Sequence, residues 1–137
     1  MRIMAIDYGD ARTGYAISDA SGLLAGETGV LPSRNPDKLL ADLVRLYEEK
    51  GVERIALGLP RNMDGTEGVR AEKSRTLKAA LEERGCAVDL VDERRTTVEA
   101  HAILTETGKH GRRRKNVVDA VAATLILETY LNGRREA

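Results

Sequence analysis

An apolar stretch near the start of the chain ends in a carboxylate, and this junction strongly constrains the fold. Four apolar residues, Ile3 to Ile6, run directly into Asp7, and glycines follow at positions 9 and 14. A strand that is apolar on both faces lies inside a sheet, where Asp is depleted. Asp7 therefore costs stability unless it meets a cation or hydrogen-bond donors, or faces solvent at the mouth of a hairpin. Gly9 and Gly14 permit a tight reversal and the close approach of a ligand to the backbone.

Length and composition limit the class of protein. At 137 residues the chain fits one domain, residues 1–137, with a core of its own. Cys86 is the one cysteine, which excludes a disulfide framework and a cysteine-built metal site, and we expect it in the core. No apolar run approaches the roughly 18 residues that cross a bilayer. The first residues lack the apolar region of a signal peptide. These features predict a cytoplasmic protein.

The charge is balanced overall but is clustered locally. Lys and Arg number 22, as do Asp and Glu. The four tyrosines are the only aromatic residues, so platforms for base stacking are scarce and contacts to a nucleic-acid backbone are expected to dominate. A solvated charged loop is the ordinary explanation of a basic run, but this run adjoins the final helix. We expect a loop that is mobile without substrate and contacts nucleic acid through Lys109, Arg112, Arg113, Arg114 and Lys115.

Hydrophobic periodicity and turn residues predict the elements. A helix is expected to start at Asn35-Pro36-Asp37, where Asn caps and Pro takes the first position. The final helix is apolar almost all round and is expected to be buried. This order predicts an α/β fold with a mixed five-stranded sheet, a three-strand antiparallel meander plus two parallel strands, flanked by helices. The expected strands are 2–8, 13–19, 23–31, 54–59 and 86–91, and the helices are 36–50, 69–84, 96–107 and 115–131.

Asp119 is the acid that fits least well in a solvated position. At 100° per residue it shares a helix side with Ala122, Ala123 and Ile126, and the small alanines allow that side to approach the sheet closely. The alternative is an ion pair with Lys115, which would contribute only about 0.2–0.5 kcal/mol in this orientation. A functional Asp119 is the better interpretation.

Asp92 and Glu93 end the last expected strand, where ligands of open parallel sheets bind. Alternation puts the two on opposite sides and does not decide which points at Asp7. Neutralisation by Arg94 or Arg95 is the alternative. Three converging carboxylates suit hard cations such as Mg²⁺ or Mn²⁺. A pair of such ions about 4 Å apart activates water and stabilises the leaving oxygen in phosphodiester hydrolysis.

Four blocks in order resemble the YqgF (RuvX) family over nearly the whole chain. That family has the RNase H-like fold and is described as Holliday-junction-resolvase-like and as pre-16S rRNA nucleases. The blocks are Asp7-Tyr8-Gly9-Asp10-Ala11-Arg12-Thr13-Gly14, Gly58-Leu59-Pro60-Arg61-Asn62-Met63-Asp64-Gly65-Thr66-Glu67-Gly68, Asp92-Glu93-Arg94-Arg95-Thr96-Thr97 and Arg114-Lys115-Asn116-Val117-Val118-Asp119-Ala120-Val121-Ala122-Ala123.

The resemblance implies that Asp7, Glu93 and Asp119 are the catalytic, metal-binding acids, and it thereby selects Glu93 over Asp92. It implies a metal-dependent nuclease with two Mg²⁺ or Mn²⁺ ions that processes the 5′ end of pre-16S rRNA. A Holliday junction resolvase acting on DNA is the alternative, and symmetric junction cleavage would require a homodimer. A non-catalytic nucleic-acid-binding module is disfavoured, because a binder of phosphates gains nothing from clustered negative charge.

The remaining marked residues are assigned to nucleic-acid contacts or to turns. Arg12 is expected to contact a phosphate near the metals, with a pair to Asp10 as the alternative, and Lys115 is expected near the scissile phosphate. The loop 60–68 carries Asn62 and Gly65 and is expected to present backbone N–H groups to a strand. Its alternative is a plain connector. His101 and His110 have no ligand partner at metal spacing and are expected to be non-catalytic.

Overall fold

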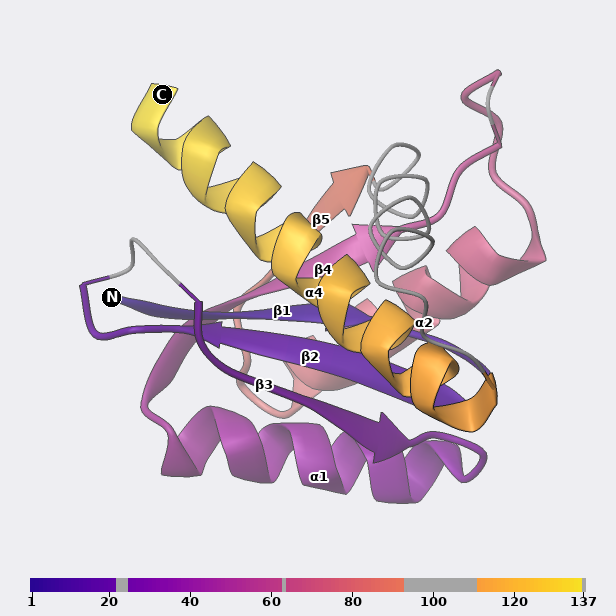
Figure 1. The fold of residues 1–137 in the computed structure, drawn as a ribbon, viewed down its shortest axis with the longest axis horizontal. Helices are drawn as coiled ribbons and strands as arrows, with labels where there is room; N and C mark the ends of the chain where they lie inside the picture. The colour runs from indigo at the N-terminus through magenta and orange to yellow at the C-terminus, as the bar shows by residue number, and fades with distance from the viewer. Residues whose placement is uncertain (22–24, 63, 93–110, 137) are drawn as a thin grey trace.

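The structure is a computed structural model that describes residues 1–21, 25–62, 64–92 and 111–136. For 111–117 and 134–136 it describes the backbone alone. Five strands and three helices occupy these ranges (Figure 1). They are β1 (Arg2–Asp7), β2 (Arg12–Ser18), β3 (Ala25–Pro32), α1 (Pro36–Glu49), β4 (Val52–Leu59), α2 (Val69–Glu83), β5 (Val88–Asp92) and α4 (Gly111–Glu136).

The five strands form one mixed sheet in the order β3-β2-β1-β4-β5. β1 pairs antiparallel with β2, and β2 pairs antiparallel with β3. β4 runs parallel to β1 on one side and to β5 on the other. The predicted meander with two added parallel strands is confirmed. Because β1 lies at the centre, its end is flanked by neighbouring strands on both sides.

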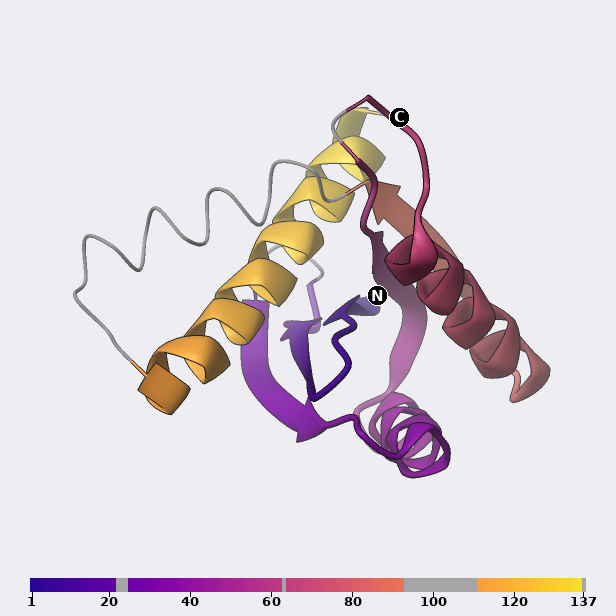
Figure 2. The same ribbon diagram turned by 90° about the vertical axis from the view of Figure 1, so that its right-hand side faces the viewer.

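Helices α1 and α2 cover one face of the sheet (Figure 2). Asn35 caps α1, since its side-chain oxygen accepts hydrogen bonds from the backbone N–H groups of Asp37 and Lys38, as the sequence predicts. Leu39 and Leu43 of α1 pack with Ile6 and with buried side chains of α2. Cys86 is buried in this cluster, which confirms the prediction for that residue.

Helix α4 covers the opposite face (Figure 2). Its buried side chains pack on Ile3, Ala5, Ala16 and Ala56, and the small residues let the helix lie close to the strands. Two predictions about this helix are wrong. It begins at Gly111, inside the segment expected to be a loop, and it ends at Glu136. It is also buried on one side only among its described side chains, namely Ala122, Ala123, Ile126, Leu127 and Leu131.

No helix in the described part of the chain is long and apolar enough to cross a membrane. The expected helix 96–107 lies outside the described residues, as do His101 and His110.

Candidate active site

The side chain of Asp7 belongs to the face of the sheet that α4 covers. Along β1, Met4 and Ile6 pack in the cluster beneath α1 and α2, whereas Ile3 and Ala5 pack beneath α4. Successive residues of a strand point to opposite faces, so Asp7 shares the face of Ile3 and Ala5. It is the last residue of the central strand and is only partly buried. The strand therefore delivers a carboxylate to the rim of the α4 face.

Gly14 brings Asp119 of α4 to the same place. Gly14 is paired with Asp7 across the β1–β2 ladder, where partner Cα atoms lie about 4.5–5.5 Å apart. A Cβ atom on Gly14 would lie 2.1 Å from the backbone oxygen of Asp119 and 3.1 Å from its Cβ. The helix backbone thus rests directly on this glycine. The close approach that Gly14 permits is made by the chain's own helix, and it places two acids from distant parts of the sequence side by side.

Asp119 is held by an ion pair with Arg12. The Arg12 Nε donates to Asp119 Oδ2 over 2.9 Å, between side chains that are 35% and 17% exposed. Burial raises the pKa of the Asp119 carboxyl above its usual value, while the hydrogen bond and charge of Arg12, with a smaller effect of Arg70, act in the opposite direction. The alternative pair of Arg12 with Asp10 is not formed, since Arg12 binds Asp119 and Asp10 binds Lys73, and the side chain of Lys115 lies outside the described part of the chain.

Gly9 permits the turn that leads from β1 into Arg12. A Cβ atom on Gly9 would lie 2.4 Å from the backbone oxygen of Arg12, so a larger residue would force the turn open. The buried Ser33 hydroxyl donates to the Gly9 carbonyl over 2.5 Å and ties the turn to the end of β3. The turn therefore fixes the position from which Arg12 reaches Asp119.

Two basic residues of α2 reach the same rim, and sequence reasoning missed both. Arg70 donates to the backbone oxygen of Tyr8 over 3.3 Å, and Lys73 Nζ lies 2.9 Å from Asp10 Oδ1. That hydrogen bond, followed by the Lys73 charge, lowers the pKa of Asp10. Arg70 and Lys73 are three residues apart and therefore share one face of α2. No local sequence signal links that face to a turn more than 60 residues earlier in the chain.

Asp92 is directed away from the acid pair. Val91 packs beneath α4, so Asp92 takes the opposite side of β5, and its carboxylate lies 3.9 Å from Arg61 Nη1. Arg61 also forms an ion pair with Glu67, and a backbone bridge joins the same two residues. These two contacts close the base of the loop 60–68. Asp92 is therefore part of the support of this loop through Arg61, whereas Arg94 and Arg95 lie outside the described residues.

The loop 60–68 is folded on itself by its own side chains. Asn62 donates from Nδ2 to Thr66 Oγ1 over 2.9 Å, and Asp64 accepts from the Thr66 backbone and hydroxyl. Gly65 has a φ of 90°, a conformation that favours glycine. The described part of this loop is a tight turn in which the amide of Asn62 already has an intramolecular partner.

Several predicted site residues fall where the structure describes no side chain. Glu93 and Lys109 lie outside the described residues. Arg112, Arg113, Arg114 and Lys115 belong to the first turns of α4, where the structure describes backbone alone, so the expected basic loop is helical from Gly111 onward.

The described acids offer a partial set of metal ligands. Within the described ranges no group of three or more His, Cys, Asp or Glu side chains gathers at one point. Asp7 and Asp119 supply carboxylate oxygens, which suit hard divalent cations such as Mg²⁺ and Mn²⁺. The donor set therefore fits such an ion, provided that a further oxygen ligand joins the pair.

Comparisons with known proteins agree on the family. The family model described as RuvX, Holliday junction resolvase, matches residues 1–133. A protein of Halothermothrix orenii named "Putative pre-16S rRNA nuclease" is 44% identical over 133 residues, which cover 96% of this chain and 95% of that protein. A protein of Syntrophus aciditrophicus with the same name is 45% identical over 139 residues, covering 96% and 89%.

The solved structures show the fold. RuvC of T. thermophilus in complex with a Holliday junction substrate has a TM-score of 0.64 at 15% identity and covers 100% of this chain and 97% of its own. The Fowlpox virus resolvase in complex with Holliday junction DNA has a TM-score of 0.60 at 12% identity, with 98% and 99% covered. Both resemble this chain along its whole length, which confirms the predicted RNase H-like architecture.

Proposed function

The chain belongs to the RuvX family, and we propose that it is a metal-dependent nuclease that hydrolyses phosphodiester bonds in precursor 16S rRNA. The observation that carries this proposal is that Gly14, the strand partner of Asp7, rests against Asp119, which brings both acids to one face at the end of the central strand. Two neighbouring carboxylates repel one another, and burial of Asp119 adds to the cost. A cation between them removes that cost, whereas a module that only bound phosphates would be weakened by it.

Glu93 is proposed as the third ligand. It follows β5 directly, and the family resemblance assigns it to the acids of the site. Val91 lies on the α4 face and Asp92 on the other, so the alternation of the strand, continued by one residue, would give position 93 the face of Asp7. Strand alternation alone does not decide between Asp92 and Glu93. Because Val91 lies on the α4 face, the same alternation now favours Glu93.

Asp7, Glu93 and Asp119 would hold one or two Mg²⁺ or Mn²⁺ ions. Such ions supply an activated water and stabilise the leaving oxygen of the phosphodiester. The chain's own contribution is to hold the carboxylates on rigid elements, a strand end and a packed helix, so that little reorganisation accompanies the reaction. In this proposal the sheet and the helices that cover it form one nuclease domain.

Arg12 is proposed to exchange partners during the reaction. Its guanidinium neutralises Asp119 in the structure described here, and the same group is suited to bidentate contact with a phosphate. With Asp119 holding a divalent ion, the Arg12 guanidinium would be released from this pair and could turn toward the substrate. Arg12 would then orient the phosphate whose bond is cut.

Replacing Arg12 with glutamine separates these two roles. We expect the Arg12→Gln variant to bind Mn²⁺ about tenfold more tightly without nucleic acid, because a charged hydrogen bond no longer competes for Asp119. At saturating Mn²⁺ we expect cleavage about 10- to 100-fold slower, because the phosphate loses a charged donor. Calorimetric Mn²⁺ titration and single-turnover cleavage measure the two effects.

Arg45→Gln is the matched control, since Arg45 makes a similar ion pair with Asp42 on α1. It should leave both measurements unchanged. Weaker Mn²⁺ binding by Arg12→Gln would show that Arg12 supports the acids instead of competing for them.

Basic residues at the start of α4, the helix that carries Asp119, are proposed to bind the backbone of the RNA. Arg112, Arg113, Arg114 and Lys115 lie in the first turns of α4, and Asp119 lies further along the same helix. Cations at the start of a helix oppose its dipole, a cost that phosphate contacts would offset. Lys109 and Asn62 are proposed as further backbone contacts. Precursor rRNA as substrate would place the protein in the cytoplasm.

A cleavage panel tests the substrate. Single-stranded RNA, single-stranded DNA and a four-way DNA junction are incubated with the protein in Mg²⁺ and in Mn²⁺. We expect single-stranded RNA with the sequence of the precursor 5′ end to be cut fastest. The family description favours the junction as the competing substrate. Symmetric paired cuts in the junction, together with a two-fold dimer in sedimentation, would overturn the rRNA assignment.

A further inference from the structure

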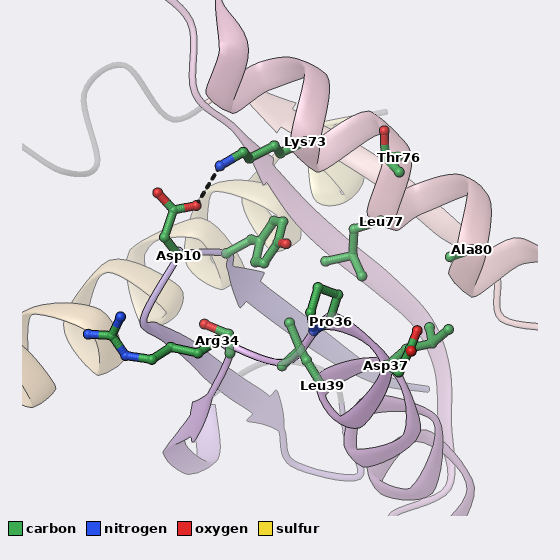
Figure 3. Close-up of a pocket in the computed structure, with 12 residues that line it drawn as sticks. Asp10, Arg34, Pro36, Asp37, Leu39, Lys73, Thr76, Leu77 and Ala80 are labelled. Atoms are coloured by element: carbon green, nitrogen blue, oxygen red, sulfur yellow. Dashed lines mark hydrogen bonds and ion pairs between the residues drawn. The ribbon is translucent and has the colours of Figure 1, made fainter.

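A cavity of about 630 Å³ lies between α1, α2 and the turn after β1 (Figure 3). It is on the face of the sheet opposite α4, and of the described acids of the proposed active site neither Asp7 nor Asp119 lines it. Leu77 of α2 points toward Pro36 and Leu39 of α1, and Ala80 lies further along α2 (Figure 3). The volume falls within the range of small-ligand sites in proteins.

Tyr8 connects this cavity to the acid pair. It follows Asp7 in the chain and takes the opposite face, where its ring packs against the core beneath α1 and α2 and lines the cavity. Arg70 of α2 donates to the Tyr8 backbone oxygen and so joins α2 to the same turn. The cavity therefore opens at the end of β1, beside the edge at which a substrate backbone would cross the sheet.

The lining suits a ligand that is apolar on its faces and polar at its edge. The interior is formed by aliphatic side chains and the Tyr8 ring. Lys73 and Asp10 form an ion pair at the rim over 2.9 Å, and Arg34 and Asp37 add one charge of each sign (Figure 3). A rim of balanced charge disfavours a bare phosphate, which needs a surplus of cations. It offers both donors and acceptors, as the edge of a nucleobase requires.

We propose that this cavity is a subsite for one unstacked base of the single-stranded RNA substrate. The base would stack against Tyr8, with its edge at the Lys73–Asp10 pair, while the backbone continues over the end of β1 toward Asp7. Recognition of single-stranded RNA commonly uses splayed bases on aromatic side chains. This subsite rests on the proposed nuclease function and adds a point at which the protein reads a base in addition to the backbone.

Filling the cavity tests the proposal in a binding assay that needs no cleavage. Ala80→Phe places a ring in the cavity, and the matched control Ala79→Phe places the same ring on the exposed side of α2. The probe is a fluorescein-labelled single-stranded RNA of the precursor sequence, with one abasic site moved along it. We expect one abasic position to weaken binding to the wild type about tenfold. Ala80→Phe should weaken binding of the intact RNA equally and add nothing to that abasic RNA.

The expected kinetic signature is a KM about tenfold higher with kcat within about twofold, because a remote base contributes to binding of ground and transition states alike. Ala79→Phe should match the wild type throughout. If Ala80→Phe unfolds the chain by circular dichroism, Thr76→Phe on the exposed rim of the same cavity replaces it. A folded cavity variant with unchanged affinity, or an equal loss for every abasic RNA, would overturn the subsite.

Other occupants give different results. If a second copy of the chain fills the cavity, Ala80→Phe will dissociate a dimer in sedimentation, which would also overturn the proposal. The same experiments distinguish the subsite from the nuclease function. If cleavage depends on Asp7 but is unaffected by the cavity variants, only the subsite proposal is refuted. If one abasic position weakens binding but the wild type cleaves no RNA, the subsite proposal stands and the nuclease function is refuted.

Discussion

The Asp7→Asn variant is expected to lose at least about 10³-fold of metal-dependent RNA cleavage, because loss of one metal ligand removes several kcal/mol of transition-state stabilisation. Asparagine keeps the size of the side chain and removes its charge. Asp7 lies beside Asp119, so losing one of two like charges should preserve or increase the stability of the metal-free protein. Single-turnover cleavage in Mn²⁺ and urea unfolding in EDTA measure the two quantities.

A second measurement separates metal binding from other causes of inactivity. Mn²⁺ should raise the melting temperature of the wild type, because it binds the folded state alone, and this rise should shrink in Asp7→Asn. Asp19→Asn is the matched control. Asp19 accepts a hydrogen bond from the Ser21 hydroxyl and follows Ser18, the last residue of β2, at the end of that strand away from Arg12. It should cut and respond to Mn²⁺ as the wild type does. Undiminished cleavage by Asp7→Asn would refute the assignment of the active site.

The Gly14→Ala variant is expected to lose about 1–3 kcal/mol of stability, because a single methyl group overpacks the contact with α4. The new Cβ would lie 2.1 Å from the Asp119 backbone oxygen, so the helix or the strand must move. Such movement carries the Asp119 carboxylate away from Asp7. A displacement of about 1 Å at a reacting centre costs roughly 10²-fold in rate, and we expect a cleavage defect of that size. Urea unfolding and cleavage rates measure both.

Gly26→Ala is the control within the same sheet. Its Cβ would make ordinary contact with Asp19 at 3.4 Å, so stability and cleavage should stay close to the wild type. If Gly14→Ala is as stable and as active as Gly26→Ala, α4 does not rest on β2 at this point. A stable but inactive Gly14→Ala would show that the packing adapts while the acid pair does not.

Local signals predicted those parts of the fold that neighbouring residues determine. Asn35 caps α1 as expected because its partners are the next two backbone N–H groups. Asp7 was a candidate because a carboxylate at the end of an apolar strand is costly unless it meets a cation, donors or solvent, and its role stays a prediction. Asp119 was a candidate because the small residues on its side of the helix predicted close packing, and the structure confirms that packing for Ala122 and Ala123.

Long-range pairings were beyond such signals. Arg12 and Asp119 are 107 residues apart, and each had a closer residue of opposite charge that fitted local rules better. The start of α4 was missed for a related reason. Gly111 and three arginines are typical of a loop, and cations oppose the dipole at a helix start, yet Arg is a good helix former. The face of Asp92 required the packing of Val91, which the sequence does not reveal.

The packing of α4 on Gly14 also has a consequence during protein synthesis. Asp7 lies in β1 and Asp119 lies in α4, so Asp7 leaves the ribosome well before Asp119 does. Domains form during translation from the N-terminal end onward. A nascent chain that has completed its sheet thus still lacks half of the acid pair. If the proposed site is the active site, the growing polypeptide is expected to be inert toward RNA until α4 docks on the sheet.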